Sequence, residues 1–197
     1  MSKQMMALAI AAATVMACPA EATTVALAGD GNWNEFNVDN LIAADFGNGW
    51  IDTADGSALS FTFTVPAGEI GRLTVVDAGF AGDTFTLTNF GAAIGVTSGV
   101  AVGTTAGSTQ FDFDAALADP AYSRGLFTFG AGSYSISGAL LQSVLDGGID
   151  LDATDGAVRL SLSAVPEPAG TTLMLGGFAA LALVARRRQA GKSVHSL

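Results

Sequence analysis

The chain has 197 residues, of which half are hydrophobic and only 13% are charged, and its net charge is −10. Between residues 23 and 164, three arginines stand against 16 acidic residues, so this region carries a net charge of −13. Such an acidic surface repels phosphate groups, which excludes nucleic-acid binding as a function. The single cysteine, Cys18, lies near the N-terminus, so the region after it has no disulfide.

Residues 1–22 have the pattern of a signal peptide. Lys3 precedes an apolar run over residues 5–17, and small residues before position 23 fit the rule for signal-peptidase cleavage. The run is shorter than a membrane-spanning helix requires. We therefore expect export with Thr23 as the mature N-terminus. The alternative is a degenerate lipoprotein motif that makes Cys18 a lipid anchor.

An oxygen-rich segment follows. Asp30, Asn32 and Asn34 alternate along the chain as the ligands of calcium loops do, which predicts a calcium site. The segment departs from an EF-hand loop, because a glutamate stands where glycine is expected. A second oxygen-rich turn contains three aspartates: Asp150, Asp152 and Asp155. Both segments are also explained as ordinary β turns, in which Asp and Asn are common.

Two tryptophans, Trp33 and Trp50, lie among Asn, Asp and Gly residues. Carbohydrate-binding modules stack sugar rings on exposed aromatic side chains beside such polar groups. Both residues are therefore candidate ligand-binding residues. The alternative is that each packs on the hydrophobic core, because large aromatic residues are mostly buried.

Segments of alternating apolar and polar residues predict an all-β domain over residues 23–164. In residues 58–65, four apolar side chains alternate with Ser and Thr, which places them on one face of a strand: Leu59, Phe61, Phe63 and Val65. Five further strands are predicted over residues 70–76, 84–89, 92–97, 133–137 and 158–162. Short helices are predicted over residues 114–121 and 139–145. Glycine-rich turns separate the strands, so we expect two packed antiparallel sheets, a β-sandwich or jelly roll.

The region over residues 23–164 contains no His, Cys or Lys. Catalytic triads, Schiff-base lysines and histidine-ligated zinc are therefore excluded, and we expect no enzyme activity and no cofactor other than calcium. The remaining enzyme class is a glycosidase that uses two carboxylates. Glu35 and Glu69 are the only glutamates in the region.

The C-terminal end predicts a transmembrane helix over about residues 169–185. Residues 168–185 carry no charge and span about 27 Å as a helix, close to the hydrocarbon thickness of about 30 Å. Three arginines follow: Arg186, Arg187 and Arg188. Clustered arginines remain in the cytoplasm, so residues 190–197 form a cytoplasmic tail and the acidic domain lies outside.

Four residues stand directly before this helix: Val165, Pro166, Glu167 and Pro168. Proline–glutamate–proline, a short apolar helix and an arginine cluster, in this order, resemble the PEP-CTERM sorting signal over residues 165–189. The resemblance implies processing by an exosortase in the inner membrane, then delivery to the cell surface or extracellular matrix of a Gram-negative bacterium. The stretch over residues 73–98 is also similar to ectodomains that precede this signal.

The expected function is therefore that of an exported structural or adhesive protein, held transiently in the membrane by its C-terminal helix and associated with exopolysaccharide. The alternative is a carbohydrate-binding module that binds sugar through Trp33 and Trp50, assisted by calcium at Asp30, Asn32 and Asn34.

Overall fold

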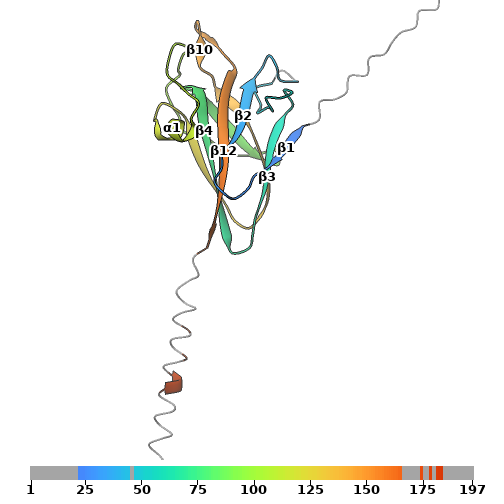
Figure 1. Cartoon of the computed structure of the whole chain (residues 1–197), viewed down its shortest axis with the longest axis vertical. Helices are drawn as coiled ribbons and strands as arrows, with labels where there is room; N and C mark the ends of the chain where they lie inside the picture. Colours follow the sequence, from blue (N-terminus) through green and yellow to red (C-terminus); the bar gives the residue numbers. More distant parts are fainter. Residues whose placement is uncertain (1–21, 45–46, 166–173, 175–177, 179–180, 184–197) are drawn as a thin grey trace, which may run out of the picture.

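The computed structural model describes residues 22–44, 47–165, 174, 178 and 181–183 (Figure 1). The part between residues 22 and 165 is all-β, with one short helix among its described residues. The elements, in chain order, are β1 Thr23–Ala26, β2 Asn34–Asp39, β3 Leu59–Val65, β4 Glu69–Phe80, β5 Thr84–Asn89, β6 Ala92–Val96, β7 Thr109–Gln110, α1 Phe113–Ala118, β8 Arg124–Phe129, β9 Gly132–Gln142, β10 Leu145–Asp146, β11 Ile149–Asp150 and β12 Ala153–Ala164.

The strands form two main sheets and a small hairpin. The first sheet has the order β1-β3-β9-β5-β6; the second has β2-β12-β4, with β7 and β8 both paired to β4. β10 and β11 form the hairpin. Neighbouring strands are antiparallel except β1 and β3, which run parallel with Thr23 opposite Leu59. This corrects the prediction of purely antiparallel sheets. The long connection from β1 to β3 allows the parallel pairing, which a tight hairpin would not.

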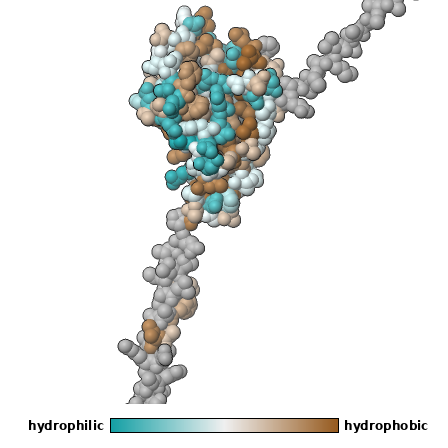
Figure 2. Space-filling view, viewed as in Figure 1, coloured by the Kyte–Doolittle hydropathy of each residue, from teal (hydrophilic) through white to brown (hydrophobic). Residues whose placement is uncertain are grey.

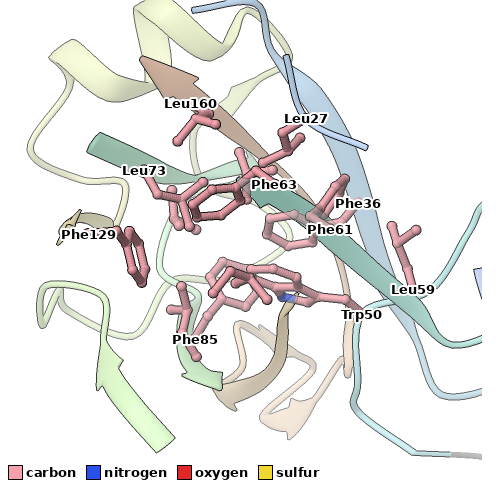
Figure 3. Close-up of a cluster of buried hydrophobic side chains, with 14 of the residues drawn as sticks. Leu27, Phe36, Trp50, Leu59, Phe61, Phe63, Leu73, Phe85, Phe129 and Leu160 are labelled. Atoms are coloured by element: carbon pink, nitrogen blue, oxygen red, sulfur yellow. The ribbon is translucent and has the colours of Figure 1, made fainter. Parts of the chain in front are cut away.

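The two main sheets face each other across one hydrophobic core (Figure 3). The alternation predicted for β3 is confirmed, because its four apolar side chains are all buried. In the first sheet they are joined by Phe85, Leu87 and Ile136, and the second sheet contributes Phe36, Val38, Leu73, Val75, Val158 and Leu160. Polar side chains alternate with these residues on the outer faces, as expected for sheets that each bury one side.

Trp50 is part of this core and is only 2% exposed. Its ring stacks on Phe36 with 4.0 Å between the ring centroids. Its backbone N–H donates to the carbonyl of Gly138 on β9 at 2.9 Å. A Cβ atom at position 138 would collide with the indole ring, so glycine lets the ring lie directly against the β9 backbone. Trp50 thus fixes the segment before β3 onto the first sheet.

The helix predicted over residues 139–145 is absent. Residues 139–142 instead continue β9, where Ala139 and Leu140 pair with Thr86 and Phe85 of β5, and Leu145 begins β10. The side-chain amide of Gln142 donates to the carbonyl of Gly82 at 2.7 Å. Pairing with a neighbouring strand therefore outweighs the local helix propensity of Ala, Leu and Gln.

The other predicted helix is confirmed with shifted ends, as α1. The Asp112 carboxylate caps it by accepting from the backbone N–H groups of Asp114 and Ala115 at 3.0 and 3.1 Å. The helix covers the outer face of the second sheet, where a smaller hydrophobic cluster contains Val76, Ala116, Tyr122 and Ala157. The remainder of that face stays open.

Two aspartates flank the turn from β4 to β5 and are fully buried, Asp77 and Asp83. Asp77 accepts from the N–H of Asp83 at 3.2 Å, and Asp83 accepts from the N–H of Val144 at 2.8 Å. Asp77 Oδ1 and Asp83 Oδ2 have no hydrogen-bond partner. Burial and then the charge of Asp83 raise the pKa of Asp77 to about 9, and burial raises the pKa of Asp83 to about 6. Asp77 and Asp83 therefore hold the turn against the segment that follows β9, and neither side chain is accessible to a ligand.

Candidate functional site

A groove of about 360 Å³ lies on the open part of the outer face of the second sheet. Its walls come from the end of β2, the end of β4 and the start of β12, together with the segments around Ile42, Thr53 and Phe111. The groove combines exposed apolar side chains with carboxylates, an amide and hydroxyls. This combination is typical of small-molecule and sugar sites.

The polar floor of the groove is set by the register of β2 and β12. Asn37 pairs with Asp155, and Asp39 pairs with Ala153, so all three polar side chains point to the outer face. Asn37 Nδ2 donates to Asp155 Oδ1. Asp39 Oδ1 accepts from the N–H of Leu41 at 2.9 Å. These donors hold both carboxylates in place while leaving one oxygen of each for another partner.

Burial changes the pKa of two carboxylates on this face of the sheet. Burial raises the pKa of Asp155 above the ordinary value of an aspartate. Glu35 lies outside the groove, two residues before Asn37 on β2, and burial followed by the charge of Asp155 raises its pKa. The negative charges are therefore concentrated along one stripe of the sheet, and no basic residue lines the groove.

The apolar part of the groove includes two aromatic rings. Phe111, just before α1, is 69% exposed, and Phe80, the last residue of β4, is half-buried. Between them Gly79 has a φ of 74°. A Cβ atom there would lie 3.4 Å from Asp155 Oδ2, so the glycine keeps this oxygen uncovered.

The groove lies at the end of the domain away from Val165. β12 begins at the groove and leaves the domain at its lower end in Figure 1, whereas β10 marks the upper end. From Asp155 to Ala164 the strand covers about 30 Å. Hydrophobic atoms gather at the surface of the upper end (Figure 2).

A second hollow of about 410 Å³ lies on the first sheet, against Thr62, Thr64 and Tyr134. It includes the ring of Phe90, which is 69% exposed, but no charged side chain. We regard the groove on the second sheet as the candidate site, because of these two hollows it is the one that combines an exposed ring with carboxylates.

The predicted calcium ligands lie away from this groove. Asn32 donates to both carboxylate oxygens of Asp30, and Asn34 Nδ2 donates to the carbonyl of Asn32 at 3.2 Å. Asp30 bridges Ser161 on β12, about 20 Å along the strand from Asp155. The segment forms an Asx turn, and its calcium ligation stays a prediction. Among the residues that the structure describes, no three Asp, Glu, His or Cys side chains lie close enough together to hold a metal ion.

The three aspartates of the second predicted turn are separated by the fold. Asp150 belongs to β11 and Asp155 to β12. Between them, Asp152 accepts from the side-chain amides of Asn40 and Asn48 at 3.2 and 3.0 Å. The sequence therefore identified Asp155 as a candidate site residue. It did not predict that Asp155 lies in the groove, because this depends on its pairing with Asn37 of β2.

The two tryptophans differ sharply. For Trp50 the interpretation that it packs on the hydrophobic core is confirmed, and its candidate role in stacking on a ligand is wrong, because its ring lies in the core. Trp33 is half-buried, and the guanidinium carbon of Arg159 lies 4.3 Å from the centroid of its ring. Arg159 also forms an ion pair of 2.8 Å with Asp114 on α1. One face of Trp33 is therefore occupied, and its role in sugar binding stays a prediction.

Glu35 and Glu69 do not form a catalytic pair. Glu35 pairs with Ala157 and Glu69 with Ala164, which places them about 23 Å apart along β12. Glycosidases need their two carboxyl groups within about 10 Å of each other. A carboxylate-only glycosidase that uses these two residues is thus excluded by the geometry.

Most of the sorting signal lies outside the described residues. Val165 is described, and its N–H donates to the carbonyl of Gly68 at 2.8 Å. Residues 166–168 and 186–188 are not described, nor are residues 1–21 of the predicted signal peptide. Of the predicted transmembrane segment, residues 174, 178 and 181–183 are described, as helix. The described residues include no helix with the length and hydrophobicity to cross a membrane.

No protein-family model matches the chain, and no curated protein matches it. Among solved structures it is similar to the pre-peptidase C-terminal domain of a collagenase from Bacillus anthracis. That likeness has 11% sequence identity and a TM-score of 0.37, and it covers 74% of this chain and 99% of the other. At this TM-score it assigns neither a fold nor a function.

Proposed function

We propose that this chain is an exported protein of a Gram-negative bacterium whose β-sandwich ectodomain attaches to polysaccharide at the cell surface or in the extracellular matrix. A signal peptide over residues 1–22 and a PEP-CTERM-like tail over residues 165–189, with its transmembrane helix and exosortase processing, would deliver the domain. The groove on the second sheet carries the binding part of this proposal. In this proposal the domain adheres to the surface or matrix because the groove binds carbohydrate.

The groove has the chemistry that sugar rings require. An exposed phenyl ring, Phe111, can lie against the C–H face of a sugar, and Asn37, Asp39 and Asp155 accept hydrogen bonds from its hydroxyls. We propose binding without turnover as the role of this groove. With the C-terminal segment on the membrane side, the groove faces outward.

Removal of the Phe111 ring tests the binding site. In affinity electrophoresis of the full-length chain through gels that contain the exopolysaccharide of its host, we expect wild-type protein to be retarded. Phe111→Ala should weaken binding about tenfold, the equivalent of about 1.4 kcal/mol. Phe90→Ala is the matched control, because Phe90 is equally exposed but lies in the other hollow. Equal retardation of wild type and Phe111→Ala would remove the groove from the proposal.

The delivery route has its own test. We expect the protein recovered from the surface or medium of its host to have an intact mass that lacks residues 1–22 and everything beyond the segment 165–168. A mass that retains residues 173–188 would mean stable anchoring, and the sorting part of the proposal would be wrong.

A further inference from the structure

The groove has a surplus of hydrogen-bond acceptors and is lined by no basic side chain. Asp39 Oδ2 and Asp155 Oδ2 accept no hydrogen bond from any described residue, since the donors nearby are bound to the Oδ1 atoms. Asn37 Oδ1 is buried and also lacks a partner. Its Nδ2 is already used on Asp155. The site therefore offers three acceptors where a ligand with several N–H or O–H donors would bind.

The basic residues of the described region do not neutralise this charge. Arg159, the nearest along β12, is held by Asp114 and by the ring of Trp33. Arg124 donates to the carbonyl of Leu117 on α1. Arg72 pairs with Ser161, six residues along β12 from Asp155. A cationic group on the ligand would therefore meet unpaired carboxylates.

Asp39 and Asp155 are spaced to share one such group. They are diagonal neighbours on the same face of the β2–β12 pair, which puts their Cβ atoms about 7 Å apart. An ammonium group between them would donate one N–H to a carboxylate oxygen on each side at ordinary N–H···O distances of about 2.8 Å. Its third N–H remains for Asn37 or water. The half-buried position of Asp155 strengthens such a bond, because little water competes there.

We infer that the groove binds a polysaccharide with free amino sugars, the ammonium group lying between Asp39 and Asp155 while the sugar ring packs against Phe111. This inference rests on the proposed function. Uronic-acid polymers are the wrong ligands, because their carboxylates would face Asp39, Asp155 and the net charge of −13 between residues 23 and 164.

Three oligosaccharide probes test the inference on the full-length chain: a glucosamine hexamer, the fully N-acetylated hexamer and an oligogalacturonate. By isothermal titration calorimetry at pH 6 and low salt, we expect the glucosamine hexamer to bind at least tenfold more tightly than the acetylated one. The oligogalacturonate should not bind. The advantage of the amine should shrink as salt is added, because salt screens partly exposed charges.

Substitutions in the groove test whether the tighter binding of the glucosamine hexamer arises there. Asp155→Asn keeps an acceptor for Asn37 but removes the charge, so the glucosamine hexamer should lose most of its advantage while binding of the acetylated hexamer changes little. Asp39→Asn should act in the same direction. Asp150→Asn is the control, because Asp150 is exposed on β11 and does not line the groove.

Each outcome has one meaning. Equal binding of the acetylated and amino hexamers would overturn the amino-sugar inference and leave polysaccharide binding intact. The same loss in Asp150→Asn as in Asp155→Asn would mean non-specific attraction to an acidic protein, and would also overturn it. If none of the three probes binds but the host exopolysaccharide does, the inference fails alone. If that polysaccharide is not bound either, the proposed function fails with it.

Discussion

Replacement of Trp50 by alanine is expected to lower the free energy of unfolding by about 3–5 kcal/mol. The side chain is 2% exposed, stacks on Phe36, and has edge contacts with Phe61 and Phe85 at centroid distances of 6.0 and 6.4 Å. Alanine would leave a cavity between the two sheets that rigid β strands fill poorly. Urea denaturation followed by circular dichroism measures the loss.

Trp33→Ala is the control for this experiment, because Trp33 is half-buried and packs outside the main core. Its expected cost is about 1–2 kcal/mol, from lost packing and the lost contact with Arg159. Trp50→Phe should cost less than Trp50→Ala, since it keeps an aromatic ring and removes the indole N–H, which has no hydrogen-bond partner. A loss in Trp50→Ala no larger than in Trp33→Ala would contradict the position of Trp50 in the core.

The second large effect is a fall in stability as the pH rises, caused by Asp77. Its pKa is raised from 3.8 to about 9 in the folded chain, so the folded state binds a proton that the unfolded state has already released. The stability from this proton is fully present below about pH 4 and is lost as the pH rises through about 9. Between these values one such group changes the free energy of unfolding by up to about 1.4 kcal/mol per pH unit. The proton is best placed on Oδ1, which lacks a partner.

Asp77→Asn isolates this effect, because asparagine resembles the neutral carboxyl group and does not titrate. Between pH 6.5 and 8.5, above the pKa of about 6 of Asp83, we expect the wild-type free energy of unfolding to fall and that of Asp77→Asn to stay flat. Asp150→Asn, at an exposed site, should keep the wild-type slope. Denaturation curves at several pH values measure the slopes. A wild-type slope of zero in this range would show that Asp77 is not held neutral.

The strands with strong alternation could be predicted from the sequence. β3 and β5 have the expected positions, and their apolar side chains point into the core, because a period of two is a local property of the chain. The end of β9 could not be predicted, because Ala139 and its neighbours favour a helix in isolation and become a strand only beside β5. The burial of Trp50 agrees with the prediction that a large aromatic side chain packs on the core, whereas its partners on strands remote in sequence could not be predicted.

The groove could not be predicted from the sequence, for a related reason. Asn37 and Asp155 are 118 residues apart, and only the pairing of β2 with β12 brings them together. Phe111 carries a weak signal, since an aromatic residue between Gln110 and Asp112 is unusual for a buried position. The sorting signal is the opposite case. It is a purely local pattern over residues 165–189, and it remains a prediction because most of it lies outside the described residues.

The course of β12 determines how the domain would respond to mechanical force. A ligand in the groove would be held at the start of this strand, whereas Val165 follows its end, so tension between the ligand and Val165 would run along the strand axis. β12 is paired with β4 from Asp155 to Ala164 and with β2 along its first half. Interstrand hydrogen bonds lie perpendicular to the strands, so this pull loads them together in shear instead of opening them one by one. Under the proposed function, this arrangement would make the domain resist tension between a polysaccharide in the groove and the cell.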